Sequence, residues 1–125
     1  MPGKILVLDD SEDTLTAVKD VLEVSGYEVK PINDWRQIFE TLETFEPDLI
    51  ILDYLLKDSN GGEICHQIKS NPRWNHVPVI ILTAYPKVLL SLGTYGCDLF
   101  LEKPFDVQNF IDEVSKFFDF NATKQ

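Results

Sequence analysis

The sequence predicts an α/β protein in which a parallel β-sheet lies between two layers of helices. Three observations support this fold class. Short aliphatic runs such as Ile5–Leu8 are typical of strands that are buried on both faces of a sheet. Each run is followed by apolar residues at helical spacing, and five such strand–helix units predict a doubly wound, three-layered fold. The chain has 125 residues, of which 44% are hydrophobic and 26% charged, so we expect one globular domain.

The first strand and the first helix occupy the amino-terminal residues. Ile5–Leu8 forms the strand, and Ser11 is the expected N-cap of the helix, because two acidic residues follow it in the first helical turn. Gly26 ends this helix, since glycine readily adopts the backbone conformation that terminates helices. Residues 27–30 alternate between apolar and polar side chains over a short length, which favours an edge strand.

The middle of the chain contains the second helix, the third strand and the third helix. The second helix is expected to begin at Asn33 or Asp34 and to continue to about Phe45. Residues 49–52 are continuously aliphatic and form a buried strand. The turn at Asn60–Gly62 then starts the third helix, whose inner face carries apolar residues at helical spacing.

Two further units complete the predicted fold. Residues 77–82 form the fourth strand, and Pro86 opens a short fourth helix that ends near residues 93–96. Residues 99–101 form the fifth strand. Asp106 is the expected N-cap of the last helix, which carries apolar residues along one face.

Charged or hydroxyl-bearing residues stand at or just after the ends of four predicted strands. They are Asp9, Asp10, Asp53, Thr83 and Lys103. In a doubly wound sheet, ligands bind outside the carboxyl ends of the strands. We therefore expect three carboxylates, one hydroxyl and one ammonium group to meet at a single functional site.

These groups suit phosphate chemistry with a magnesium ion. Neighbouring carboxylates repel one another, and a hard divalent cation such as Mg²⁺, which prefers oxygen ligands, relieves that repulsion. An aspartate carboxylate can attack phosphorus and form an aspartyl phosphate. Lys103 and Thr83 can then bind phosphoryl oxygens, the first through its charge and the second through its hydroxyl.

Each of these residues also has a purely structural explanation. An acidic residue after a strand commonly caps the following helix, and a threonine at a strand end is commonly structural. However, only one residue of the Asp9-Asp10 pair can cap the first helix. The combination of suitable groups at four strand ends therefore favours a functional site.

The same residues resemble the receiver domain of two-component response regulators. The matching motifs occur in the right order and spacing, and they are Asp9-Asp10, Asp53, Thr83-Ala84 and Lys103-Pro104-Phe105. The resemblance covers essentially the whole chain, with a receiver domain at residues 1–121 and a short polar tail at residues 122–125. It implies a flavodoxin-like sheet of five strands in the order 2-1-3-4-5, with five helices.

The resemblance also implies a role for each matching residue. Asp53 accepts a phosphoryl group from a histidine kinase or a histidine phosphotransfer protein, and Thr83 and Lys103 assist this transfer. The metal ion, Mg²⁺ (or Mn²⁺), is held by oxygen atoms of Asp9, Asp10, Asp53 and Leu55, the last through its main-chain carbonyl. The protein is thus expected to be a signalling switch that takes part in its own phosphorylation and dephosphorylation, and not an enzyme acting on other substrates.

Residues around the expected phosphorylation site determine how the switch responds. The neighbours of the phosphate-binding residues are Tyr54, Ala84 and Tyr85. Thr83 and Phe100 occupy the two positions whose side chains change conformation when receiver domains are activated. A phenylalanine in a strand is, however, also a common core residue. Leu55 and Tyr85 are bulky and poor at orienting water, so we expect the phosphoaspartate to hydrolyse slowly.

The predicted fourth helix carries more apolar residues than a single inward face can hold. They are Val88, Leu89, Leu90 and Leu92. In the receiver family, the surface formed by the fourth helix, the fifth strand and the fifth helix contacts output partners or dimerises. We expect this chain to bind a downstream protein target, or to form a homodimer, through that surface.

Charge and composition argue against several other classes of protein. Eleven Lys and Arg residues stand against 21 Asp and Glu residues, and the resulting net charge of −10 argues against direct binding to nucleic acid or to an anionic membrane. No apolar segment is long enough for membrane insertion or a signal peptide. Cys65 and Cys97 are too few for a disulfide framework, so we expect reduced packing residues in a cytoplasmic protein.

Three other functions compete with that of a cycling receiver. The first is a receiver-like interaction scaffold that never turns over phosphate, and the sequence leaves it open. The second, a haloacid-dehalogenase-type phosphatase, needs an Asp-x-Asp spacing that Asp9-Asp10-Ser11 lacks. The third, a flavodoxin-like electron carrier, needs a Ser-, Thr- and Gly-rich loop after the first strand, where this chain has the acidic residues 10–13.

Overall fold

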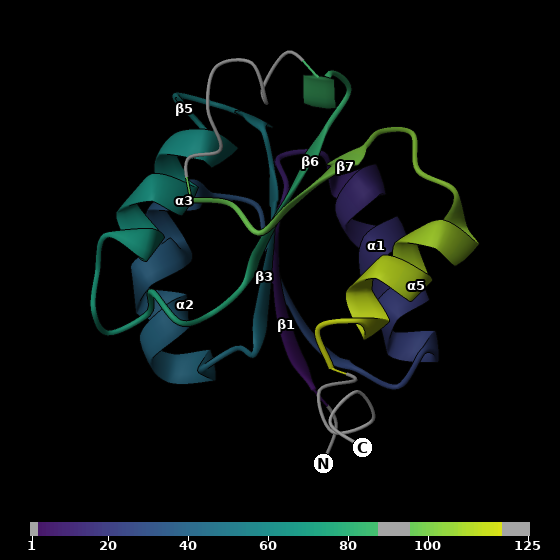
Figure 1. The fold of residues 1–125 in the computed structure, drawn as a ribbon, viewed down its shortest axis with the longest axis horizontal. Coiled ribbons are helices and arrows are strands. Elements are labelled where there is room, and N and C mark those ends of the chain that lie inside the picture. The colour runs from purple at the N-terminus through teal and green to yellow at the C-terminus, as the bar shows by residue number, and fades with distance from the viewer. Residues whose placement is uncertain (1–2, 88–95, 119–125) are drawn as a thin grey trace.

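The computed structural model describes residues 3–87 and 96–118 of the chain. Figure 1 shows three layers, with a central sheet between one pair of helices, α2 and α3, and another pair, α1 and α5. This arrangement confirms the predicted doubly wound α/β architecture.

The sheet consists of five parallel strands in the order β2-β1-β3-β6-β7. Their bounds are Lys4–Leu8 for β1, Glu28–Ile32 for β2, Leu49–Asp53 for β3, Val79–Thr83 for β6 and Leu99–Glu102 for β7. In chain order this is the expected topology 2-1-3-4-5. The edge strand β2 extends two residues beyond the predicted residues 27–30. Pro31 lies within it, because an edge strand does not need every N–H group for pairing.

The described helices begin close to the predicted capping residues. Their bounds are Glu12–Val24 for α1, Trp35–Gln37 for the 3₁₀ turn η1, Ile38–Phe45 for α2, Gly61–Lys69 for α3 and Val107–Ser115 for α5. The side chains of four N-cap residues accept hydrogen bonds from backbone N–H groups of the turns that follow, and these residues are Ser11, Asp34, Asn60 and Asp106. Pro86 and Lys87 are helical, and the rest of the expected fourth helix lies outside the described residues.

A small antiparallel hairpin between β3 and α3 was not predicted. It pairs β4, Leu55–Leu56, with β5, Ser59–Asn60. Asp58 closes the turn with a left-handed backbone conformation, at φ 63°. Strands of only two residues carry no detectable side-chain alternation, so periodicity in the sequence could not reveal them.

Alternate residues of each strand point into two separate hydrophobic layers. Leu6 and Leu8 of β1 pack toward α2 and α3, whereas Ile5 and Val7 pack toward α1 and α5. Every residue of the central strands β3 and β6 is buried, as the continuous aliphatic runs predict.

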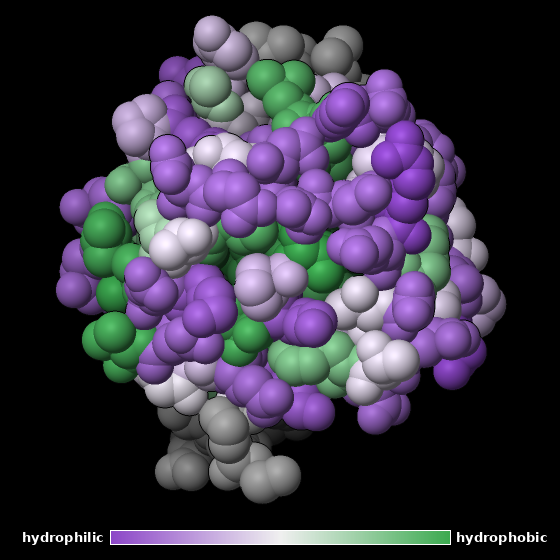
Figure 2. Space-filling view, turned by 180° about the vertical axis from the view of Figure 1, so that it is seen from behind, coloured by the Kyte–Doolittle hydropathy of each residue, from purple (hydrophilic) through white to green (hydrophobic). Residues whose placement is uncertain are grey.

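Polar side chains dominate the face opposite to the one seen in Figure 1. Seen from behind, the molecule is mostly hydrophilic, and hydrophobic residues appear in limited areas between polar ones (Figure 2). No helix within residues 3–87 and 96–118 is long and apolar enough to span a membrane.

Candidate functional site

The carboxyl ends of the central strands bring the predicted site residues together. Asp9 directly follows β1, Asp53 and Thr83 are the last residues of β3 and β6, and Lys103 directly follows β7. Parallel pairing in register places these four strand ends at the same edge of the sheet. Asp10 lies beside them, close enough for its charge to act on Asp53.

Lys103 forms the central contact of the site. Its Nζ lies 2.9 Å from Oδ1 of Asp53 and 3.4 Å from Oδ2 of Asp9, so one ammonium group is shared by two carboxylates. Its backbone N–H donates to the carbonyl of Thr83 at 2.8 Å, which fixes the start of the loop after β7. Burial lowers the pKa of Lys103, but the hydrogen bond to Asp53 and the charge of Asp9 outweigh burial and raise the pKa above its ordinary value.

Asp53 is held in an environment that disfavours its charge. Only 9% of the residue is exposed. Burial raises its pKa, the hydrogen bond from Lys103 opposes this effect, and the negative charges of Asp9 and Asp10 add to the increase. The net result is a pKa above the ordinary value, because the contact with Lys103 does not offset burial together with the two neighbouring acids.

Asp9 and Asp10 differ sharply in exposure, and neither one caps helix α1. Asp9 is 2% exposed, and its Oδ1 accepts a hydrogen bond from the backbone N–H of Ser11 at 2.9 Å. Asp10 is exposed, and its carboxylate accepts a hydrogen bond from the backbone N–H of Lys57. Ser11 is the N-cap instead, so the structural explanation of this acidic pair as helix caps is wrong.

The oxygen-rich character of the site fits a hard cation, although its acidic groups are not arranged as metal ligands. Within the described part of the chain, no group of three or more His, Cys, Asp or Glu side chains is positioned to hold a metal ion. Asp10 is turned toward the backbone of Lys57, and Asp53 and Asp9 are turned toward Lys103. Three carboxylates with one counter-charge are nevertheless the donor chemistry that Mg²⁺ prefers.

The loop after Asp53 is held by backbone hydrogen bonds. The N–H of Tyr54 donates to the carbonyl of Leu82 at 2.9 Å, and the N–H of Gly61 donates to the carbonyl of Tyr54 at 2.7 Å. A Cβ atom at Gly61 would lie 2.5 Å from the carbonyl oxygen of Asp53. The sequence indicated only a turn at Gly61, and its contact with the backbone of Asp53 was missed because it depends on how α3 packs against β3.

Thr83 and the two residues after it line the other side of the site. Thr83 is 5% exposed, and its hydroxyl oxygen accepts a hydrogen bond from the backbone N–H of Tyr85 at 3.1 Å. Ala84 and Tyr85 are exposed, Tyr85 by 68%. Leu55, across the site in the hairpin, is 72% exposed. Both bulky side chains expected to border the phosphate are thus at the surface.

Phe100 lies in β7, half-buried against the core layer next to α2 and α3. It therefore packs as a core residue on one side and reaches the surface on the other. Its assignment as a conformational switch stays a prediction.

Hollows on the surface flank the site on both sides. One of about 500 Å³ is bordered by Asp10, Trp35, Arg36 and Lys57. Another of about 480 Å³ lies against Lys103 and is mainly apolar, with Ala17, Pro104 and Phe105 among its lining residues.

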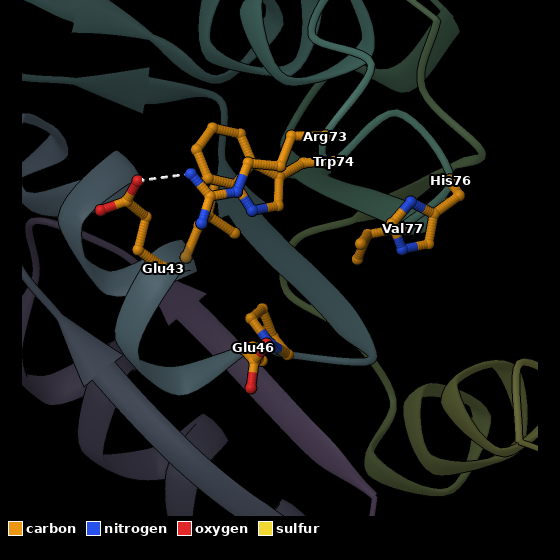
Figure 3. A pocket seen from close by; sticks show the side chains of 8 residues that line it. Glu43, Glu46, Arg73, Trp74, His76 and Val77 are labelled. Carbon is orange, nitrogen blue, oxygen red and sulfur yellow. Dashed lines mark hydrogen bonds and ion pairs between the residues drawn. The ribbon is translucent and has the colours of Figure 1, made fainter.

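A third hollow of about 150 Å³ lies at the opposite end of the sheet, where β3 and β6 begin. There Arg73 stacks on Trp74 and pairs with Glu43 at 2.7 Å, while Glu46 and His76 line other sides (Figure 3). This hollow is remote from the acidic cluster and shares no lining residue with it.

Comparison with known proteins identifies the family. A family model described as the response regulator receiver domain matches residues 5–115. The polar-differentiation response regulator DivK of Brucella anthropi is 27% identical over 121 residues, covering 94% of this chain and 97% of DivK. The transcriptional regulatory protein PhoP of Bacillus subtilis, named for alkaline phosphatase synthesis, is 39% identical over 110 residues, covering 84% of this chain.

Several of these relatives are much longer than this chain. The chain spans 44% of the length of PhoP and 16% of the length of protein RcaC of Microchaete diplosiphon, to which it is 31% identical over 106 residues. Among solved structures, the signal receiver domain of a histidine kinase from Syntrophus aciditrophicus has a TM-score of 0.83 at 31% identity, covering 92% of this chain and 89% of that domain.

Proposed function

This chain belongs to the response regulator receiver family, and on that basis we propose that it is a phosphorylation-dependent switch in which Asp53 accepts the phosphoryl group. The donor is a phosphohistidine on a histidine kinase or a histidine phosphotransfer protein. Phosphorylation changes the surface around β7, through which the chain acts on a downstream protein. The proposed location is the cytoplasm.

The observation that carries this proposal is the contact of Lys103 with both Asp53 and Asp9. A buried carboxylate needs a compensating charge, and a phosphoryl group on Asp53 would bring further negative oxygens to the same place. The Lys103 ammonium is already 2.9 Å from the carboxylate and can pair with one of those oxygens.

The proposed transfer is a single displacement at phosphorus. An oxygen of the Asp53 carboxylate attacks the phosphorus atom, the bond from phosphorus to the donor imidazole breaks, and the imidazole leaves with the electron pair. Thr83 assists by donating its hydroxyl hydrogen to a phosphoryl oxygen. Its oxygen accepts a hydrogen bond from the backbone N–H of Tyr85, and a turn of the side chain toward the phosphoryl group would break that bond. Such a turn links phosphorylation to the loop after β6.

A divalent cation, Mg²⁺ or Mn²⁺, would supply positive charge between the carboxylates and the phosphoryl oxygens. The residues that would hold it are Asp9, Asp10 and Asp53, together with the main-chain carbonyl of Leu55. The pKa of Asp53 is raised mainly by burial, and the negative charges of Asp9 and Asp10 add to that increase, so a further positive charge at this place would stabilise the carboxylate.

The apolar hollow next to Lys103 suits the approach of the phosphodonor protein. Ala17 contributes to it from α1, and Pro104 and Phe105 contribute from the loop that carries Lys103. A partner seated there would exclude water beside Asp53 during the transfer. The surface formed by the expected fourth helix, β7 and α5 is the proposed output side, and a homodimer could also form through it. Residues 88–95 of that surface lie outside the described residues.

The test uses acetyl phosphate as a small-molecule donor. The protein is incubated with acetyl phosphate and Mg²⁺, and a retarded band is sought on a phosphate-affinity gel. Asp53→Asn is expected to abolish the band, whereas Asp58→Asn, which alters an acid with a 61% exposed side chain in the nearby hairpin, is expected to retain it.

Each other outcome contradicts the proposal in a distinct way. A band that persists in Asp53→Asn would assign the phosphate to another residue. Steady hydrolysis of phosphate esters would indicate a phosphatase. The absence of any band with acetyl phosphate and with phosphohistidine donors would favour the non-cycling scaffold.

A further inference from the structure

The two cysteines of the chain meet between helix α3 and the start of β7. Cys65 lies on α3 and is fully buried, and Cys97 lies two residues before β7 and is half-buried. Cys97 packs against the hydrophobic layer that contains Cys65, and its thiol donates to the carbonyl of Leu99 at 2.9 Å. A side-chain interaction between the two thiols shifts the pKa of both. They are 32 positions apart in the sequence, so only the tertiary structure brings them together.

The contact is part of a continuous attachment of residues 96–98 to one face of α3. Lys69, one helical turn after Cys65, forms an ion pair with Asp98 at 2.9 Å. The backbone of Gly96 lies against the side chain of Lys69, close enough that an ideal Cβ on Gly96 would come within 3.2 Å of its Cγ. Figure 1 shows the chain entering β7 from beside α3. The thiols are therefore held near each other by their neighbours on both sides.

We propose that Cys65 and Cys97 form a dithiol–disulfide pair, in which Cys97 reacts with the oxidant first and Cys65 then closes the bond. The geometry supplies both parts of this assignment. Cys97 retains access to solvent, whereas Cys65 is fully buried and closed to a bulky oxidant. The surrounding ion pair between Lys69 and Asp98 keeps the two segments in place while the bond forms.

The electrostatic surroundings agree with these roles. The interaction between the two thiols lowers the pKa of Cys97, burial opposes this, and backbone groups of Leu99 and Ile81 lower it further. The same interaction and burial raise the pKa of Cys65. Because the thiolate is the attacking form, Cys97 is the thiol poised to react with an oxidant.

The proposed oxidant is a small-molecule disulfide such as oxidised glutathione. The Cys97 thiolate attacks one sulfur of the small disulfide, forming a mixed disulfide and releasing one small thiolate. The Cys65 thiol then loses its proton and attacks the Cys97 sulfur, which releases the second small thiolate and closes the protein disulfide. Two electrons pass from the protein to the oxidant, and the two protons end on the released thiols.

Closure of this bond would tie α3 covalently to the segment that leads into β7. Lys103 lies at the other end of the same strand. The pair is thus placed to restrain one of the strands that build the phosphorylation site, although its formation does not depend on phosphorylation of Asp53.

The experiment treats the native, full-length chain with oxidised glutathione and measures intact mass, free thiols and disulfide-linked peptides. The expected product is a monomer that has lost two hydrogens and both free thiols, with the Cys65 and Cys97 peptides linked. In Cys65→Ala, Cys97 is expected to stop at the mixed disulfide with glutathione. In Cys97→Ala, Cys65 is expected to remain unmodified.

Several results would overturn the proposal. They are retention of both thiols in the wild-type chain, accumulation of the wild-type mixed disulfide without closure, and a disulfide between two chains. Reaction of Cys65 in Cys97→Ala would reverse the assigned order. Because Cys65 is fully buried, circular dichroism checks the folding of its variant, and the wild-type measurement decides the proposal if that variant does not fold.

Discussion

The ammonium group of Lys103 lies 2.9 Å from the carboxylate of Asp53. Lys103 follows the edge strand β7, which is separated by β6 from β3, the strand that carries Asp53. The same ammonium group lies 3.4 Å from Asp9, so a single cation is shared by two buried acids. The charge balance of the site therefore depends on Lys103, and a cation or a phosphoryl group bound there must compete with or complement this contact.

Replacing Lys103 by methionine is expected to slow phosphorylation of Asp53 by acetyl phosphate by about 100-fold, because a positioned positive charge is lost where negative charge develops. The rate is measured from the growth of the phosphorylated band under matched conditions. Lys116→Met is the control, since Lys116 has a 68% exposed side chain and pairs only with Glu113 among the ion pairs of the described residues. Equal rates in the two variants would remove Lys103 from the mechanism.

Asp53 is expected to make the folded chain less stable as pH rises. Its pKa in the folded chain is above the ordinary value of 3.8, so the folded state binds the proton more tightly than the unfolded state. The free energy of unfolding contributed by this group is therefore highest below the unfolded pKa, and it falls as pH rises through the folded pKa.

Asp53→Asn should remove that slope and raise the free energy of unfolding at neutral pH by about 1 kcal/mol. Urea denaturation of both proteins at about pH 4 and about pH 7 measures the difference. An Asp53→Asn protein that is less stable than the wild type at neutral pH would show that the ion pair with Lys103 outweighs burial and repulsion.

A phosphoaspartate at Asp53 is expected to hydrolyse slowly, because Leu55 cannot orient a water molecule for attack. Leu55 is 72% exposed, so an asparagine there is accommodated without disturbing the core. Leu55→Asn is expected to raise the dephosphorylation rate by about tenfold, as a positioned water gains access to the phosphorus. The rate is measured from the loss of the retarded band on a phosphate-affinity gel after acetyl phosphate is removed. An unchanged rate in Leu55→Asn would refute the explanation.

Gly61→Ala is expected to impair phosphorylation as well as stability. The added Cβ would lie 2.5 Å from the carbonyl oxygen of Asp53, so the backbone of the acceptor residue must move, at a cost of about 1–3 kcal/mol. Gly26→Ala is the comparison, because Gly26 has φ 101° but an added Cβ meets nothing within 4 Å. That variant should lose about 1 kcal/mol of stability and keep the wild-type phosphorylation rate.

Binding of Mg²⁺ should be visible in the fluorescence of Trp35. Trp35 borders the same hollow as Asp10, and its indole N–H is buried without a hydrogen-bond partner. Titration with Mg²⁺ is expected to change the fluorescence emission of the wild type. Trp74→Phe is expected to show the same change, because Trp74 lies at the opposite end of the sheet. Trp35→Phe should abolish the change, and Asp10→Asn should raise the required Mg²⁺ concentration about tenfold.

The sequence by itself determined the order of the five sheet strands and the residues at their ends, although not the β4–β5 hairpin. Continuous aliphatic runs are sufficient to indicate β1, β3 and β6, because a strand buried on both faces excludes polar residues. The sequence also predicted the N-cap at Ser11, since capping depends on residues that are close to one another in the chain. Because the carboxyl ends of parallel strands meet at one edge of a sheet, the sequence also places Asp9, Asp53 and Thr83 at the same edge.

Only the tertiary structure decided which of those residues touch and which contacts lie elsewhere. The shared pairing of Lys103 with Asp53 and Asp9 depends on how far the chain after β7 reaches across the sheet. The contact between Cys65 and Cys97 depends on helix packing, and it appeared in the sequence only as two separate residues. Local patterns record the conformation of neighbouring residues, whereas contacts between distant residues arise from packing, which leaves no periodic signal in the chain.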